Sequence, residues 1–348
     1  MKTRIFSKAS LCVIMLLALS ATTVSAKTWR INNDTRKQAN FTDINAAMAS
    51  AEVAAGDTLY LDPGCVLSSK QTITKAVTVI GTGYFLPNGL VGAKINADLY
   101  IKAAGAKMNA VTITGIVYIE NDNITLERCM INYRIQMSGG IRYGLTVLQC
   151  YINCSSVSSS VEGEFRNATI KNNIIRNQYR YAAIRNVHES EISNNYLVTD
   201  RCPSNEIYDV IYNVTNSQIY NNIIKHGSYP DRIFANSASD CNNSFHNNVV
   251  TAAEGTYSNV SNIVWLGSAD VSNVFAEGTD DAAYHLKEGS PAKGAAADGG
   301  DCGPYGGATP YVEGGKPLYH PFINDVTVSV KPVNGKIKLK LNAKMQNE

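Results

Sequence analysis

Basic and aromatic side chains gather in the middle of the chain, in a pattern that suits binding of an acidic polysaccharide. When the internal repeats described below are aligned, Arg176 and Lys225 fall in one column, two repeats apart. Further residues of these kinds lie in nearby segments: Tyr179, Arg180, Tyr181, Arg185, Arg201 and His226. Cationic groups pair with carboxylates and aromatic rings offer flat apolar faces, so these residues form our candidate binding strip.

The reaction that fits such a strip is proton abstraction beside a uronate carboxylate, followed by elimination. It needs a base, for which Lys225 is the candidate if burial makes it neutral, and a cation or an arginine (Arg176 or Arg180) to neutralise the carboxylate. No cofactor is evident, calcium stays open as that cation, and the histidines show no metal-ligand spacing. The alternative is that these outward Arg and Lys side chains only solvate the surface.

A repeated phrase supplies the elements that must position these residues. Four clear copies begin at Ala168, Ser190, Ser217 and Asn243, and each contains an Asn-Asn pair. Two weaker copies precede them, and the aligned column reads Cys129, Cys150, Asn173, Asn195, Asn222 and Asn248. The steps are 21, 23, 22, 27 and 26 residues, a drifting period that is typical of a solenoid built from short β-rich units.

Alternating apolar and polar residues make each repeat strand-based. Ile170 beside Lys171 is one example, and further apolar segments end near Ile184, Ile211 and Phe234, so each repeat holds at least two strands. The pattern predicts rungs of a right-handed parallel β-helix that stack about 4.8 Å apart. The aligned asparagines would then form a ladder in which each amide bonds its neighbours above and below.

Further motifs at both ends resemble those of secreted parallel β-helix proteins of the pectin-lyase-like superfamily, of the kind exported by Bacteroidetes-type bacteria. Residues 41–51 look like their N-terminal capping helix, 56–64 like the first strand, and 289–294 with 301–305 like the closing rung. The resemblance implies fold and export, and it implies contact with carbohydrate. It does not fix an activity, because the paired acids of the hydrolases and the acidic cluster of the calcium-dependent lyases are not found at matching positions.

Residues 1–26 read as a secretory signal peptide. They carry three basic residues, an apolar stretch from Leu11 to Leu19 and the small-residue exit Val24-Ser25-Ala26. The stretch is too short to span a bilayer, so no transmembrane segment is expected. Its removal leaves 28 basic residues against 29 acidic ones, a balance that gives no global attraction to nucleic acid. We expect a protein located in the periplasm, at the cell surface or in the medium.

The remainder divides into one β-helix over 27–322 and a β-hairpin over 323–348. Residues 326–330 and 336–341 alternate around an Asn-Gly pair, which is a hairpin signal. We expect this hairpin to cover the last rung, with a docking or secretion tag as the alternative. Capped solenoid ends favour a monomer.

Cys129 and Cys150 occupy the ladder column in adjacent rungs. Their Cα atoms should lie about one strand spacing apart, which a disulfide tolerates. A disulfide and a stacked pair of free thiols both remain open.

Two classes of function remain. One is an exported β-helix protein that engages carbohydrate, as a polysaccharide lyase acting on acidic glycans if it is an enzyme. The other is a non-catalytic surface or envelope protein that serves as a stiff rod for adhesion or structure.

Overall fold

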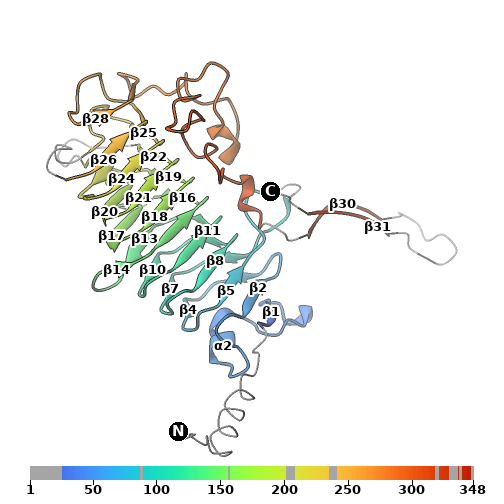
Figure 1. Ribbon diagram of the computed structural model, residues 1–348. Helices are drawn as coiled ribbons and strands as arrows, with labels where there is room; N and C mark the ends of the chain where they lie inside the picture. The colour runs from blue at the N-terminus through green and yellow to red at the C-terminus, as the bar shows by residue number, and fades with distance from the viewer. Residues whose placement is uncertain are drawn as a thin grey trace, which may run out of the picture.

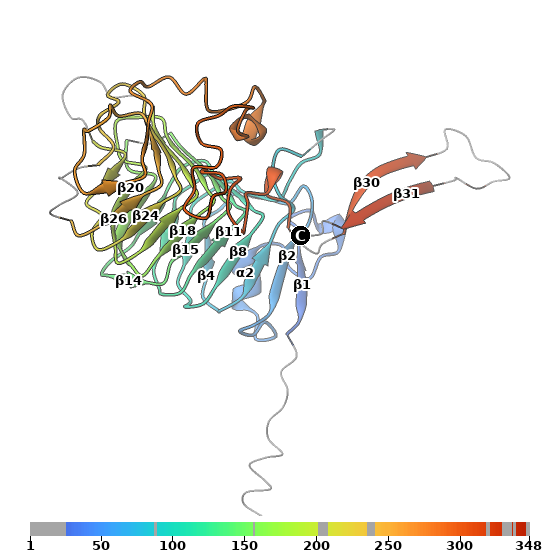
Figure 2. The ribbon, with the colours of Figure 1, turned by 45° about the horizontal axis from the view of Figure 1, so that its top comes forward.

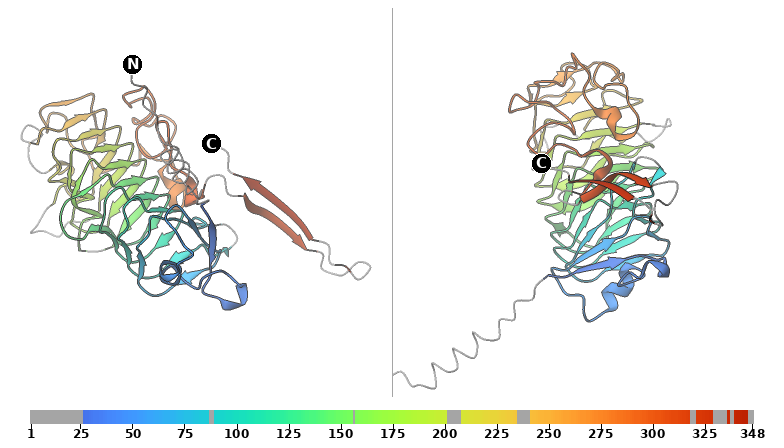
Figure 3. Two further views of the ribbon diagram at one scale, coloured as in Figure 1. Left: turned by 60° about the horizontal axis from the view of Figure 1, so that its bottom comes forward. Right: turned by 90° about the vertical axis from the view of Figure 1, so that its right-hand side faces the viewer.

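Three parallel β-sheets wind around one hydrophobic core, and the rungs follow each other along the axis from blue to orange in Figure 3. The computed structural model describes residues 26–86, 89–155, 157–200, 208–234, 241–317, 321–328, 336 and 339–345. The signal peptide prediction therefore lies outside the described residues. From β2 to β23, apart from β14, successive strands of the chain belong to sheet A, then sheet B, then sheet C, which confirms the predicted right-handed parallel β-helix (Figure 1).

The strands are short, and they stack in register. Sheet A comprises β1 (Thr28–Ile31), β2 (Thr58–Leu61), β5 (Thr78–Ile80), β8 (Lys107–Asn109), β11 (Thr125–Glu127), β15 (Thr146–Leu148), β18 (Thr169–Lys171), β21 (Glu191–Ser193), β24 (Gln218–Tyr220), β26 (Ser244–His246) and β28 (Val260–Ser261). Sheet B comprises β3 (Val66–Leu67), β6 (Lys94–Ile95), β9 (Thr112–Ile113), β12 (Met130–Ile131), β16 (Tyr151–Cys154), β19 (Ile174–Asn177), β22 (Tyr196–Thr199), β25 (Ile223–His226), β27 (Val249–Val250) and β29 (Val264–Trp265). Sheet C comprises β4 (Gln71–Ile73), β7 (Leu99–Ile101), β10 (Val117–Ile119), β13 (Ile135–Met137), β17 (Val161–Arg166), β20 (Ile184–His188) and β23 (Ile211–Tyr212), with β14 (Arg142–Tyr143) paired to β17.

A short helix closes the N-terminal end of the stack. Helix α2 (Ile44–Ala49) follows the 3-10 helix η1 (Thr35–Lys37) and buries Ile44, Ala47 and Met48. Asp43 caps α2 by accepting the Ala46 N–H at 2.7 Å, and the buried Gln71 side chain accepts the Ile44 N–H at 3.1 Å. The predicted capping helix is therefore present, although it is shorter than the 41–51 segment.

The second asparagine of each pair builds the predicted ladder. Asn195 Oδ1 accepts both the backbone N–H and the side-chain amide of Asn173, each at 2.9 Å. Asn222 does the same for Asn195, and Asn248 does so for Asn222. All four asparagines are fully buried, so these bonds satisfy polar groups that have no access to water.

The first asparagine of each pair has a different role. Each repeated phrase spans two strands, one in sheet A and one in sheet B, and this residue makes the corner between them in the left-handed region (φ 53° at Asn172, 57° at Asn221). Its side chain points outward and holds the C-terminal segment 266–317, here called the strap. Asn172 Nδ2 donates to the Pro304 and Gly306 carbonyls at 2.9 and 2.7 Å, and Asn221 Oδ1 accepts the Ala297 N–H at 2.8 Å.

The strap covers the outer face of sheet B. Tyr151, Ile174, Tyr196, Ile223 and Val249 form an outward apolar column on that sheet, and strap residues including Val274, Cys302 and Tyr311 bury it. Figure 2 shows the orange strap running back beside the rungs. Residues 289–294 and 301–305 were expected to form the closing rung, but they contain no strand and belong to the strap.

A buried network fixes the far end of the strap beside the early rungs. Asp281 lies in the 3-10 helix η3 (Asp280–Tyr284), and its Oδ2 accepts the Gly314 N–H at 2.6 Å and the Tyr311 hydroxyl at 3.1 Å. Gly314 lies in the 3-10 helix η4 (Glu313–Gly315). Tyr311 in turn shares a 2.5 Å hydrogen bond with Tyr84. Burial raises the pKa of Asp281, and the two donated hydrogen bonds only partly offset this effect.

The C-terminal hairpin does not cover the last rung. Strands β30 (Pro321–Val328) and β31 (Leu339–Met345) pair in antiparallel fashion and project away from the stack in Figures 1 and 2, while the last rung, β28 and β29, lies elsewhere. The prediction of a covering hairpin was therefore wrong in its placement. The Asn-Gly turn lies outside the described residues.

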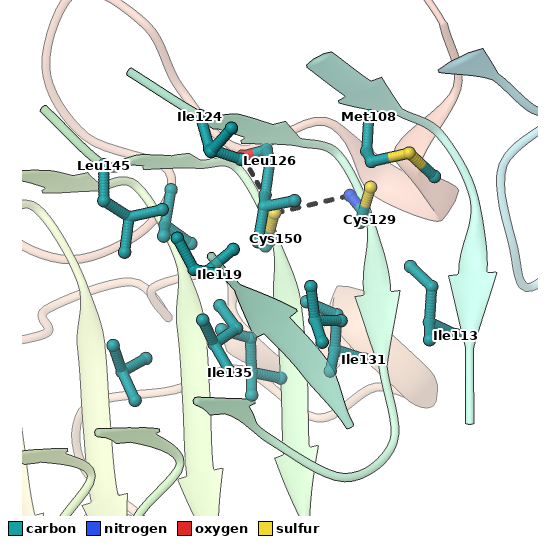
Figure 4. Close-up of a cluster of buried hydrophobic side chains, with 14 of the residues drawn as sticks. Met108, Ile113, Ile119, Ile124, Leu126, Cys129, Ile131, Ile135, Leu145 and Cys150 are labelled. Atoms are coloured by element: carbon teal, nitrogen blue, oxygen red, sulfur yellow. Dashed lines mark hydrogen bonds between the residues drawn. The ribbon is translucent and has the colours of Figure 1, made fainter. Parts of the chain in front are cut away.

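Cys129 and Cys150 stack in adjacent rungs as predicted, and they are free thiols. The Cys129 N–H donates to Cys150 Sγ at 3.4 Å, and Figure 4 shows both among the buried side chains of the core, next to Leu126. Of the two alternatives that the sequence left open, the structure therefore has the stacked pair of free thiols and not the disulfide.

Replacing Asn195 by alanine should strongly destabilise the protein. The change removes the acceptor of the buried Asn173 backbone N–H and of one side-chain N–H of Asn173, whose amide keeps only its bond to the Val147 carbonyl, so we expect the free energy of unfolding to fall by about 3 kcal/mol. Asn96→Ala is the control, because the exposed Asn96 accepts only from Thr114. Urea unfolding followed by circular dichroism measures both; equal losses would contradict the ladder's role.

Asp281→Asn should alter how stability depends on pH. Because burial raises the folded-state pKa of Asp281 above its unfolded value, its stabilising contribution is complete below the unfolded pKa and is lost as the pH rises through the folded one. Asparagine keeps a carbonyl acceptor and has no charge. The wild-type Tm minus the variant Tm should therefore grow as the pH falls from about 7 to about 4. A difference that shrinks on acidification would overturn this assignment.

Candidate functional site

The outer face of sheet C carries a row of partly exposed polar and aromatic residues along the axis of the stack. One outward residue from each successive strand falls in a single column, here called the sheet C column. In rung order it reads Thr72, Tyr100, Tyr118, Gln136, Glu162, Arg185 and Tyr212. Apolar residues of the same strands face the core, so the column follows directly from period-two alternation.

Aromatic rings and lysines form the N-terminal part of the column. Tyr100 and Tyr118 stack with ring centroids 4.4 Å apart and an interplanar angle of 19°. Lys70 Nζ lies 5.2 Å and Lys102 Nζ 5.9 Å from the Tyr100 ring centroid. Burial and the neighbouring Tyr100 raise the pKa of Tyr118, so its hydroxyl remains protonated at neutral pH.

Arg185 lies at the centre of the contacts in the C-terminal part of the sheet C column. It forms an ion pair with Glu162 at 3.2 Å, and its guanidinium carbon lies 5.8 and 5.4 Å from the ring centroids of Tyr208 and Tyr212. Tyr181 stacks on Tyr208, and their ring centroids lie 5.1 Å apart. The side chains of Arg185 and Glu162 remain 30% and 27% exposed, so a ligand can reach both.

The turn residues predicted around Arg185 join this cluster. Arg180 lies over the Tyr181 ring at 5.3 Å and its Nη2 donates to the Tyr181 hydroxyl at 3.3 Å. Tyr179 is 41% exposed in the same turn. The structure thus brings Tyr181, Arg180 and Arg185 together. Arg201 lies outside the described residues.

A second column runs beside the first, next to the corner between sheets C and A. It contains Tyr143, Arg166, His188 and Thr215, and Arg166 forms an ion pair with Glu189 at 2.5 Å. The His188 ring lies between Glu164 and Thr215. The two columns together place carboxylates, cations, an imidazole and hydroxyls on one face.

Arg176 and Lys225 lie on a different face. Their register through Val198 confirms that they are two rungs apart in one column, but that column belongs to sheet B, beside the strap. Arg176 forms an ion pair with Asp200 at 2.6 Å. Although burial opposes its charge, Tyr284 of the strap and Asp200 hold the pKa of Arg176 above its usual value. Lys225 is half-buried, near Asp270 of the strap.

His226 faces the core rather than the surface. It belongs to the column Cys154, Asn177, Thr199 and His226, all fully buried, so its prediction as a surface residue was wrong. The ring accepts hydrogen bonds at Nδ1 from the Ser228 N–H at 3.2 Å and the Tyr229 N–H at 3.0 Å. Burial lowers the pKa of His226 to about 4. Strand alternation turns adjacent residues to opposite faces, so Lys225 faces outward and His226, the next residue, faces the core.

The sequence reasoning missed most of the sheet C column. Its signal was present as short apolar–polar–apolar triplets, for example Leu99-Tyr100-Ile101 and Val117-Tyr118-Ile119. These triplets lie outside the Asn-Asn phrase, so aligning on that phrase did not align them.

Neither metal ligands nor a membrane-spanning helix are found in the part of the chain that the structure describes. Among those residues, no three His, Cys, Asp or Glu side chains are grouped so that they could hold a metal ion. In the same ranges no helix is both long and apolar enough to cross a membrane. No protein-family model matches the chain, and no curated protein matches it in sequence.

His226 should not titrate in the folded protein above about pH 5, since burial lowers its pKa to about 4. Its folded-state pKa lies below the ordinary value of about 6.5, so its contribution to stability is present at neutral pH and is lost as the pH falls through that interval. NMR of the imidazole C–H signals between pH 8 and 4.5 measures this, with His226→Gln assigning the signal. Titration of that signal near pH 6.5 would show that the ring reaches water.

Proposed function

We propose that this chain is an exported β-helix protein, monomeric, that binds an acidic polysaccharide along the outer face of sheet C. The observation that carries the proposal is the sheet C column with its aromatic rings and cations. Rungs repeat about every 4.8 Å, so an extended polymer lying along the axis meets a new outward side chain at every rung. Small ligands need an enclosed pocket, whereas a polymer gains its affinity from many such contacts.

The charges of this face favour an anionic ligand. Cations lie against the aromatic rings along its whole length: Lys70, Lys102, Arg134, Arg180 and Arg185. Glu120 and Glu162 pair with two of them. A uronate carboxylate would take the place of Glu162 on the planar Arg185 guanidinium, which can donate two parallel hydrogen bonds.

Two features of the sequence support export and carbohydrate contact. Residues 1–26 have the charge, the apolar stretch and the small-residue exit of a signal peptide. The end motifs resemble those of the pectin-lyase-like superfamily, whose members exported by Bacteroidetes-type bacteria share this layout. Both features extend the proposal to a protein located in the envelope or outside the cell.

Arg185→Ala and Tyr212→Ala should each weaken glycan binding about tenfold or more, a loss of about 1.4 kcal/mol. The measurement is affinity electrophoresis of the mature chain in gels that contain acidic or neutral polysaccharides. Lys107→Ala is the charge control, because Lys107 is exposed on sheet A. Binding that weakens as much in Lys107→Ala, or that no acidic glycan supports, would contradict the proposal.

The same samples decide whether binding leads to elimination. The measurement is ultraviolet absorbance, which rises when unsaturated uronate products form, and it is made with and without added calcium. A signal that disappears in Arg176→Ala or Lys225→Ala would assign lyase chemistry to the strip predicted from the sequence. Binding with no such signal leaves the non-catalytic surface protein, which is the alternative that the sequence left open.

A further inference from the structure

Three adjacent rungs place a carboxylate, an imidazole and a hydroxyl in line. Thr215 Oγ1 lies 2.8 Å from His188 Nδ1, and Glu164 Oε2 lies 3.3 Å from His188 Nε2. The His188 side chain is only 11% exposed, whereas that of Glu164 is 44% exposed. This is the order of acid, base and hydroxyl that activates a hydroxyl nucleophile in hydrolases of several unrelated folds.

An irregularity in the strands creates the arrangement. Glu162 pairs with Arg185 and Phe165 with Val187, so β17 has two residues, Gly163 and Glu164, where β20 has only Asn186. This bulge sets Glu164 beside the His188 ring. Gly163 permits it, because a Cβ there would lie 2.3 Å from Met137 Cβ. Bulges of this kind re-aim side chains and are frequent next to active sites.

We propose that Glu164, His188 and Thr215 form an esterase site that removes acyl groups, such as acetyl, from a ligand bound on sheet C. The identity of the natural substrate rests on the proposed glycan binding, whereas the chemistry of the site does not. His188 Nδ1 takes the proton of the Thr215 hydroxyl while Oγ1 bonds to the carbonyl carbon of the ester. The bond from that carbon to the sugar oxygen breaks, and the sugar oxygen takes the proton from His188.

Water then completes the cycle. His188 takes a proton from a water molecule, whose oxygen bonds to the carbonyl carbon of the acyl-Thr215 ester, and the Thr215 oxygen leaves with that proton. Glu164 keeps the ring in position and balances its transient positive charge. The Asn186 and Asn213 side chains, joined by a 2.8 Å hydrogen bond in the same two rungs, are the candidate amide donors for the oxyanion.

The test uses the mature full-length chain with p-nitrophenyl acetate and, separately, with acetylated xylan and acetylated pectin. Thr215→Val and His188→Gln should each reduce p-nitrophenol release roughly 100-fold or more, while Thr215→Ser should retain it because it keeps the hydroxyl. His246→Gln is the matched control, since His246 stacks on Tyr220 on sheet A. Circular dichroism shows whether each variant folds. Mass spectrometry after a short incubation should locate an acetyl group on Thr215.

Two results would overturn the proposal. One is hydrolysis by Thr215→Val at the wild-type rate, which would mean that other surface groups react with the ester. The other is no hydrolysis of any of these esters by the folded wild-type chain. Because p-nitrophenyl acetate needs no glycan contact, loss of glycan binding in Arg185→Ala with retained ester hydrolysis would separate the two proposals.

Discussion

The fold depends on hydrogen bonds between stacked side-chain amides at one corner of the rungs. The turn from sheet A to sheet B exposes backbone N–H groups to a dry interior, and the fully buried Asn173, Asn195, Asn222 and Asn248 satisfy them. Each amide bonds to the next rung, so the ladder fixes the register of the rungs from Cys150 to Asn248. Because the ladder fixes that register, outward residues of successive rungs align into columns that a long ligand can follow.

The corner also determines which faces stay accessible. Its outward asparagines hold the strap, and the strap buries the apolar column of sheet B. Sheet A presents mainly threonines at one outward position, such as Thr125, Thr146 and Thr169. Sheet C differs, because its outward residues are aromatic and charged and β17 carries a bulge. The three faces thus share one backbone pattern and differ in the side chains that the repeats leave unconstrained.

Much of the fold could be predicted from the sequence, since stacking rungs require a repeat and a buried Asn requires partners. The ladder residues and the register of Arg176 with Lys225 were predicted correctly for this reason. The strap was not, because its main-chain carbonyls and amides bond to residues far away in the chain, as Asn172 does to Pro304, and no local pattern encodes such bonds. The sheet C column was missed because each of its strands offers only one or two outward residues per rung.

The strap also changes how the molecule must come apart. In a simple solenoid each repeat touches only its neighbours, so the ends can fray one rung at a time. Here the hydrogen bond between Tyr84 and Tyr311 joins residues 227 positions apart, and other strap bonds reach the intermediate rungs. Early and late rungs therefore contact the same segment, and unfolding of either end removes part of the strap's contacts. This linkage couples rungs that are not neighbours, so the molecule behaves more like a single cooperative unit than like a nearest-neighbour array. Resistance to fraying at one end then depends in part on residues at the other end.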